Sequence, residues 1–148
     1  MPEYSNAIEI DAPPEIVFAH LVTPEGMVAW MGQHAELHPT PGGLFAVDIN
    51  GSAIRGTFLE IDPPRRVVVT WGIVGDTTIP VGSSRVEFTL IPRAGGTRLE
   101  LLHAHLPVNQ AEMHARGWEH FLARLRIAAP GGDPGPDPFA AELPLQRS

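Results

Sequence analysis

The stretch Ser84–Pro107, SRVEFTLIPRAGGTRLELLHAHLP, decides the fold of this chain. In its first half, apolar residues alternate with polar or charged ones, as they do in a strand with one buried face. The apolar residues that share this face are Val86, Phe88 and Leu90. The turn residues Pro92–Gly96 then lead into a second alternating run, Thr97–His105. The pattern predicts two antiparallel strands joined by a short turn.

Similar runs extend this pairing towards the N-terminus. We predict strands at Leu44–Ile49, Ala53–Ile61 and Arg66–Ile73. Asn50-Gly51 lies between the first two, and this dipeptide is a strong signal for a two-residue hairpin turn. No helical periodicity occurs between position 36 and the region near position 110. The sequence therefore predicts a six-strand antiparallel meander.

One strand and two short helices are predicted before the meander. Tyr4–Ile10 is short and alternating enough to be a strand. A first helix is expected over Pro14–Leu21, because proline and an acidic residue suit the first turn of a helix. Thr23 as N-cap and Pro24 at the first helical position predict a second short helix that carries Trp30.

A long helix is predicted over Asn109–Ala128, where Asn109 and Glu112 have the spacing of a capping box. Its larger side chains recur every three or four residues and predict one stripe packed on the sheet. These residues are His114, Trp118, Phe121, Leu122, Leu125 and Ala129. Residues 130–148 are rich in Pro and Gly and predict a flexible tail after a single domain of residues 1–129.

This order of elements predicts an α+β domain with the helix-grip fold. In that fold a curved antiparallel sheet wraps around a long C-terminal helix, and here two short helices follow the first strand. The chain has 148 residues, which suffices for one domain and leaves no room for a second.

Composition excludes several classes of function. The 17 acidic and 10 basic residues give a net charge of -7, which disfavours binding to nucleic acids and to anionic membranes. The chain has no Lys and no Cys, which excludes Schiff-base chemistry, disulfides and cysteine-based metal sites. No apolar run is long enough to span a membrane, and the N-terminus lacks a targeting pattern. We therefore expect a cytoplasmic protein.

Two pairs of histidines are spaced closely enough to be candidate metal ligands. His103 and His105 lie two residues apart on one predicted strand, and His34 and His38 are four residues apart. Strand ends often carry solvent-facing histidines, and Pro39 argues against a helix at the second pair. The sequence contains no dinucleotide-binding fingerprint, and we predict no metal site and no cofactor.

Several motifs together resemble one known family, the activator of heat-shock-protein-90 ATPase, homologue-1-like family. They follow the family's order over about residues 7–128: Glu25–Trp30, Gly42-Gly43 with Phe45, Gly56 with Glu60–Arg65, Val69–Trp71, Val86–Leu90, Gly95–Leu99, Leu102-His103, Gly117-Trp118 and Leu122. The resemblance implies the START-like (SRPBCC) superfamily. Members of that superfamily typically hold an apolar ligand between the sheet and the long helix.

Seven residues are predicted to bind a ligand in such a cavity: Trp30, Phe45, Trp71, Phe88, His103, Trp118 and Phe121. The alternative is that the aromatic residues fill a solid core. His103 likewise has two interpretations, a core histidine bonded to a neighbour or a polar anchor for the ligand. Asp48 and Glu60 are the nearest carboxylates, and neither is predicted on the face of His103. We therefore nominate no catalytic residue.

The sequence favours a small-molecule-binding module for an apolar or aromatic ligand. Two alternatives remain open. One is a cyclase- or hydrolase-like enzyme on the same scaffold, and the other is a co-chaperone-like protein-interaction module. No nucleic acid or membrane partner is expected, and a homodimer is left open.

Overall fold

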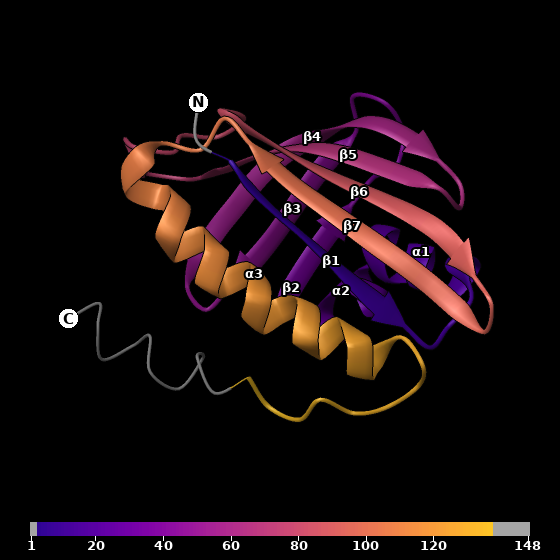
Figure 1. Cartoon of the computed structure of the whole chain (residues 1–148). Coiled ribbons are helices and arrows are strands. Elements are labelled where there is room, and N and C mark those ends of the chain that lie inside the picture. Colours follow the sequence, from indigo (N-terminus) through magenta and orange to yellow (C-terminus); the bar gives the residue numbers. More distant parts are fainter. Residues whose placement is uncertain (1–2, 138–148) are drawn as a thin grey trace.

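The computed structural model describes residues 3–137, which form one sheet packed against a long helix (Figure 1). The elements in chain order are β1 (Tyr4–Ile10), α1 (Pro14–Val22), α2 (Pro24–Val28), β2 (His34–Leu37), β3 (Leu44–Ile49), β4 (Ser52–Asp62), β5 (Arg66–Ile73), β6 (Ser84–Arg93), β7 (Gly96–Ala104) and α3 (Val108–Ala128). This order confirms the α+β helix-grip fold that the sequence predicts.

The sheet has seven strands in the order β1-β7-β6-β5-β4-β3-β2, and all neighbours are antiparallel. Strands β2 to β7 are neighbours in sequence and in space, so the six-strand meander is confirmed. β1 joins the free edge of β7, with Tyr4 opposite His103. The chain thus returns its first strand to the side of the sheet where the last strand lies.

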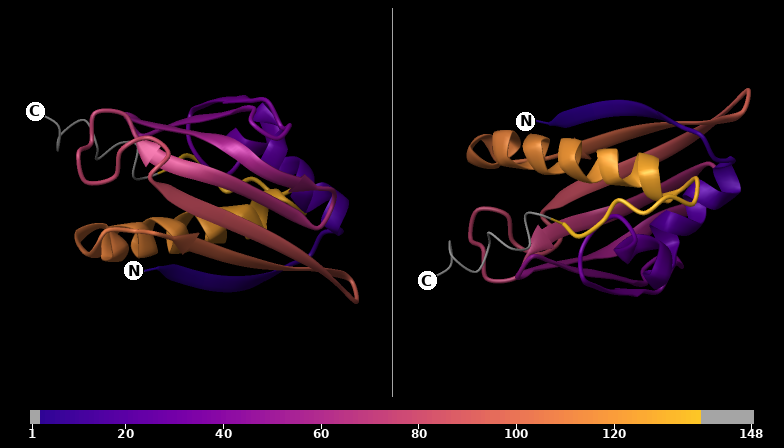
Figure 2. Two further views of the ribbon diagram at one scale, coloured as in Figure 1. Left: turned by 90° about the horizontal axis from the view of Figure 1, so that it is seen from above. Right: turned by 90° about the horizontal axis from the view of Figure 1, so that it is seen from below.

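α3 crosses one face of the sheet and lies between the β1–β7 side and the β2–β4 side (Figures 1 and 2). The pairing of β4 with β5 shifts register between Phe58 and Glu60. Such a bulge increases the local twist of a strand. A Cβ atom at Gly56 would collide with the carbonyl oxygen of Thr70, so glycine is needed for this close approach of β4 to β5.

The predicted capping box at the start of α3 is wrong. Pro107 occupies the N-cap with φ −62° and ψ 151°, and no side chain caps the helix. The helix begins at Val108, one residue before Asn109, so Asn109 lies inside the first turn instead of at the cap. The predicted stripe is confirmed except at His114, which is only half-buried; the buried members are Trp118, Phe121, Leu122, Leu125 and Ala129.

The short helices close one end of the sheet. Thr23 caps α2 as predicted, since its Oγ1 accepts a hydrogen bond of 3.0 Å from the backbone N–H of Gly26. The prediction that this helix carries Trp30 is wrong, because α2 ends at Val28; Trp30 follows it and is completely buried. Its Nε1 donates to the carbonyl oxygen of His20 on α1 at 2.9 Å, which ties the end of α2 to α1.

Residues 130–137 follow α3 and make polar contacts with the rest of the protein. Arg124 Nη2 donates to the carbonyl oxygen of Gly135 at 2.9 Å, and Asn50 Nδ2 donates to Asp137 Oδ2 at 3.2 Å. The remaining residues of the predicted tail lie outside the described residues. The flexible tail and the domain boundary before it therefore stay predictions.

Candidate ligand-binding site

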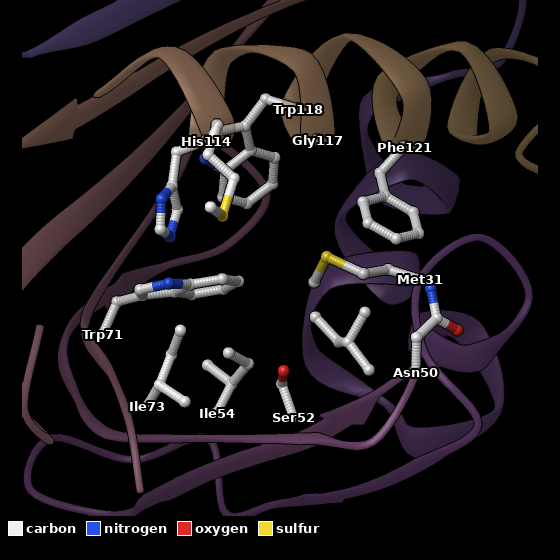
Figure 3. A pocket seen from close by; sticks show the side chains of 12 residues that line it. Met31, Asn50, Ser52, Ile54, Trp71, Ile73, His114, Gly117, Trp118 and Phe121 are labelled. Atoms are coloured by element: carbon white, nitrogen blue, oxygen red, sulfur yellow. The ribbon is translucent and has the colours of Figure 1, made fainter. Parts of the chain in front are cut away.

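A pocket of about 210 Å³ lies between α3 and the strands β3, β4 and β5 (Figure 3). Its walls are mostly apolar, with a few polar groups. The lining residues are Met31, Ile49, Asn50, Ser52, Ile54, Trp71, Ile73, Met113, His114, Gly117, Trp118 and Phe121. A concave apolar site with a small number of polar groups is typical of small-molecule binding.

α3 forms one wall of the pocket because its lining residues are spaced to share one face of a helix. Gly117 stands in the middle of this wall, between His114 and Phe121. A Cβ atom at Gly117 would meet no other atom within 4 Å. The absence of a side chain at this position therefore leaves space that the pocket uses.

The strands form the opposite wall. Ile54 lies on β4, and Trp71 and Ile73 lie on β5; Figure 3 shows their side chains below the α3 residues. Asn50 has φ 51° at the β3–β4 turn and also lines the pocket. The backbone N–H of Asn50 donates to Gln33 Oε1 at 2.7 Å, and Gln33 Nε2 donates to Asn50 Oδ1 at 2.9 Å. These two bonds fix the rim of the pocket.

His103 lies beside the pocket, in a buried chain of hydrogen bonds that we call the His103 network. Trp118 Nε1 donates to His103 Nδ1 at 3.0 Å. Because an indole N–H can only donate, the neutral imidazole carries its proton on Nε2. Nε2 donates to Ser84 Oγ at 2.8 Å, and the Ser84 hydroxyl donates to the carbonyl oxygen of Trp71 at 2.7 Å. The network thus joins α3 to β7, β6 and β5.

Burial, followed by the influence of the nearby His114, lowers the pKa of His103 to about 3. Protonation would also place a second proton on Nδ1, facing the N–H of Trp118. Both effects keep the ring neutral near pH 7. His103 is therefore bonded to neighbours through both ring nitrogens and holds Trp118 in place, while its role as a polar anchor for a ligand stays a prediction.

His114 projects from α3 towards the indole of Trp71 (Figure 3). Its Nδ1 lies 3.1 Å from the carbonyl oxygen of Gln110, and its ring centroid lies 5.1 Å from that of His103. Burial lowers the pKa of His114, while the bond to Gln110 and the charge of Asp76 act in the opposite direction. His114 is thus a mostly neutral imidazole in the pocket wall at neutral pH.

Trp71 lines the pocket with a polar group that nothing in the described structure satisfies. Its Nε1 is buried and has no hydrogen-bond partner. Leaving a buried N–H unpaired costs about 1–3 kcal/mol, so such groups call for an explanation. The ring of Trp118 lies 5.2 Å away between centroids, and its own N–H is paired with His103.

The pocket contains three of the seven residues predicted to bind a ligand: Trp71, Trp118 and Phe121. The other four are buried elsewhere and do not line it: Trp30, Phe45, Phe88 and His103. Phe45 and Phe88 pack against residues that line the pocket. The ring centroid of Phe45 lies 5.9 Å from that of Trp71, and the ring centroid of Phe88 lies 6.0 Å from that of Trp118. Whether any of these residues binds a ligand stays a prediction.

Sequence reasoning missed several residues that shape the site. His114 was assigned to the packing stripe of the helix, and the role of Ser84 as a partner of His103 was not foreseen. Ser84 is buried at the start of β6, opposite Trp71 on β5, and this pairing of strands is known only from the structure. Met31 was overlooked because it follows α2, in a region without periodicity.

The two carboxylates named from the sequence, Asp48 and Glu60, pair with arginines instead of with the imidazoles of the site. Asp48 pairs with Arg55 at 2.9 Å, and Glu60 pairs with Arg66 at 3.1 Å. Within residues 3–137, no group of three or more His, Asp or Glu side chains is placed to hold a metal ion. None of the helices in that range is long and apolar enough to cross a bilayer.

Comparisons with known proteins identify the family. The family model described as "Activator of Hsp90 ATPase homolog 1-like protein" matches residues 11–129. An AHSA1-like protein from Rhizobium etli is 43% identical, with a TM-score of 0.75, and the match covers 93% of this chain and 88% of that one. No curated protein sequence matches significantly.

Two further solved structures share the fold. An HSP90 activator from Plasmodium falciparum is 26% identical, with a TM-score of 0.70 over 84% of this chain and 94% of that one. The Aha1 dimer from Colwellia psychrerythraea is 20% identical, with a TM-score of 0.76 over 89% of this chain and 98% of that one. The match to the family model covers most of the chain, and the chain belongs to the Activator of Hsp90 ATPase homolog 1-like family, of the START-like (SRPBCC) type.

Proposed function

We propose that the protein binds a small, mostly apolar molecule in the pocket between α3 and β3–β5. The observation that carries the proposal is the open apolar space beside Gly117, bordered by Trp71 and Trp118. A concave space with mostly apolar walls and a few polar groups suits a small apolar ligand.

The volume limits the size of the ligand. A cavity of about 150 Å³ lined by apolar side chains is enough to hold benzene. The pocket of about 210 Å³ is larger than that and opens to the surface. It therefore suits a molecule with one or two rings, or an aliphatic molecule of similar bulk.

Binding takes precedence over catalysis in this proposal. The lining residues include no Asp, Glu, Lys or Arg among the described part of the chain, and His114 is their one imidazole. Acid–base catalysis needs a positioned group with a suitable pKa and, for histidine, a partner that orients it. An HSP90-activating role rests only on the names of relatives, and a homodimer also stays a prediction.

The test uses naphthalene as the probe and two variants at one position. Tryptophan fluorescence and thermal melting are followed during titration of the wild-type protein, Gly117→Leu and Gly117→Ala. We expect saturable quenching and a rise in Tm for the wild type, because a ligand of the native state stabilises it by mass action. Gly117→Leu fills the pocket and should weaken binding at least tenfold.

Gly117→Ala is the matched control, since one methyl group at the same position leaves most of the space open. It should bind naphthalene within about threefold of the wild type, because it removes little pocket volume. Equal binding by Gly117→Leu and the wild type would place the probe elsewhere. Absence of saturable binding in the wild type would overturn the proposed function.

A further inference from the structure

Trp71 and His114 form one polar end of the pocket, and the polar residues Asn50 and Ser52 lie on the other side of the apolar space (Figure 3). Both rings pack against His103, with centroid distances of 5.6 Å from Trp71 and 5.1 Å from His114. Figure 3 shows the imidazole of His114 reaching down from α3 towards the indole of Trp71, at one side of the apolar space. A molecule bound in the pocket would therefore meet the hydrogen-bonding groups of Trp71 and His114 at the same end.

Trp71 offers a donor. Its Nε1 is buried without a partner, and an indole N–H has no lone pair with which to accept. Among the three tryptophans it differs in this respect from Trp30, which donates to His20, and from Trp118, which donates to His103. A ligand atom that accepts a hydrogen bond would remove the cost of this unpaired group.

His114 offers an acceptor. Its Nδ1 lies 3.1 Å from the carbonyl oxygen of Gln110, and a carbonyl oxygen can only accept, so Nδ1 carries the proton. In the neutral ring, Nε2 then has a free lone pair for a donor. Burial, which lowers the pKa of His114, favours this neutral form at pH 7.

We propose that the ligand of this pocket carries a hydroxyl group that accepts from Trp71 Nε1–H and donates to His114 Nε2. The inference rests on the proposed binding function and narrows it to compact phenols and cyclic alcohols. A hydroxyl both accepts and donates through one atom. A ketone or ether can only accept, a carboxylate would find no cationic side chain in the lining, and an ammonium group would find no anionic one.

The experiment compares three probes of similar shape, 2-naphthol, 2-methoxynaphthalene and naphthalene, by fluorescence or calorimetric titration at pH 7. The wild-type protein should bind 2-naphthol about tenfold more tightly than either other probe. A tenfold ratio corresponds to about 1.4 kcal/mol, the contribution expected from hydrogen bonds of this kind. 2-Methoxynaphthalene can only accept a hydrogen bond, whereas 2-naphthol can both accept and donate one. Comparing the two probes therefore isolates the effect of donating to His114.

Two variants assign the preference to its residues. Trp71→Phe removes the donor and keeps an aromatic ring, while His114→Leu removes the acceptor and keeps an apolar side chain. Each should bring the affinity for 2-naphthol to within about threefold of that for naphthalene. Because both residues line the pocket, naphthalene is titrated against each variant as well, and the ratio of the two affinities separates the lost hydrogen bond from any change in pocket shape. His34→Leu, at an exposed strand position, is the control and should keep the full preference.

The outcomes separate the two proposals. If 2-naphthol and naphthalene bind saturably with equal affinity to the wild type, the hydroxyl inference is wrong and the binding function stands. A preference that survives in both variants also overturns the inference, because it would come from other groups. If none of the three probes binds saturably, the proposed function itself fails.

Discussion

The His103 network and the pocket lie next to each other beneath α3, and they differ in how completely their polar groups are paired. In the network, Trp118, His103 and Ser84 form an unbroken series of hydrogen bonds. In the pocket, Trp71 Nε1 lacks a partner and Gly117 leaves open space. A fully paired network contributes stability and a unique geometry, whereas unpaired groups beside a cavity lower stability. The difference indicates that α3 is held to the sheet by paired polar groups at one point and borders an open apolar space at the next.

The largest expected effect comes from breaking the network. His103→Leu would leave Trp118 Nε1 without an acceptor in the core and would reduce Ser84 to its bond with the Trp71 carbonyl. It should lower the free energy of unfolding by about 3 kcal/mol. His103→Gln offers an amide oxygen to Trp118 and an amide N–H to Ser84, and should lose less than half as much. Urea unfolding monitored by circular dichroism measures both.

A matched change in the pocket sharpens the contrast. His114→Leu removes an imidazole only 5.1 Å from His103, yet it should cost less than about 1 kcal/mol because no buried donor loses its partner. Equal losses for the two histidine variants would mean that the network has no special structural role.

Acidification provides a second way to break the network. The pKa of His103 in the folded state is about 3, below the value of about 6.5 expected in the unfolded chain. The unfolded state therefore takes up a proton first as the pH falls, and stability decreases through this range. From pH 7 to pH 5 this single group should remove about 2 kcal/mol.

The control for this pH dependence is His103→Gln, which has no imidazole at position 103. Its unfolding free energy should fall by about 2 kcal/mol less than that of the wild type over the same interval. Identical slopes for the two proteins would show that His103 does not stay neutral in the folded state.

On the pocket side, a stabilising change is expected. Gly117→Ala should raise the free energy of unfolding by about 0.5–1 kcal/mol, because alanine favours a helix over glycine and its Cβ meets no other atom within 4 Å. Thermal melting of the two proteins without ligand checks this. A loss of stability would mean that the space beside Gly117 is occupied.

The smallest effect is expected for the segment after α3, whose contacts with the rest of the protein, including the bond from Asn50 at the pocket rim to Asp137, are polar. Removing residues 130–148 should change the free energy of unfolding by no more than about 0.5 kcal/mol, since few apolar groups are present to offset the ordering of this segment. Melting curves of the truncated and full chains test the predicted boundary, and a shift of several degrees would assign the segment to the domain.

Much of the fold was accessible from the sequence because it depends on local periodicity. The alternation of Val86, Phe88 and Leu90 identified β6, and the spacing of Trp118 and Phe121 identified the buried side of α3. The start of α3 was misjudged because Pro107 replaces a side-chain cap.

The site was only partly accessible, because it depends on where α3 crosses the sheet. Phe88 and Trp71 both point to the inner face of the sheet, yet only Trp71 meets the open space. The bond between His103 and Trp118 joins residues on β7 and α3, and no spacing in the sequence shows which side chains meet there. The gap at Gly117 arises from the same crossing.

The indole N–H signals of the three tryptophans test the central claim most directly. In a ¹⁵N–¹H spectrum assigned with Trp→Phe variants, naphthalene should shift the signals of Trp71 and Trp118 saturably and with one dissociation constant. Trp30 lies outside the pocket and donates to His20, so its signal should stay in place as an internal control. Unchanged Trp71 and Trp118 signals up to the solubility limit of the probe, or equal shifts of all three, would contradict binding in this pocket.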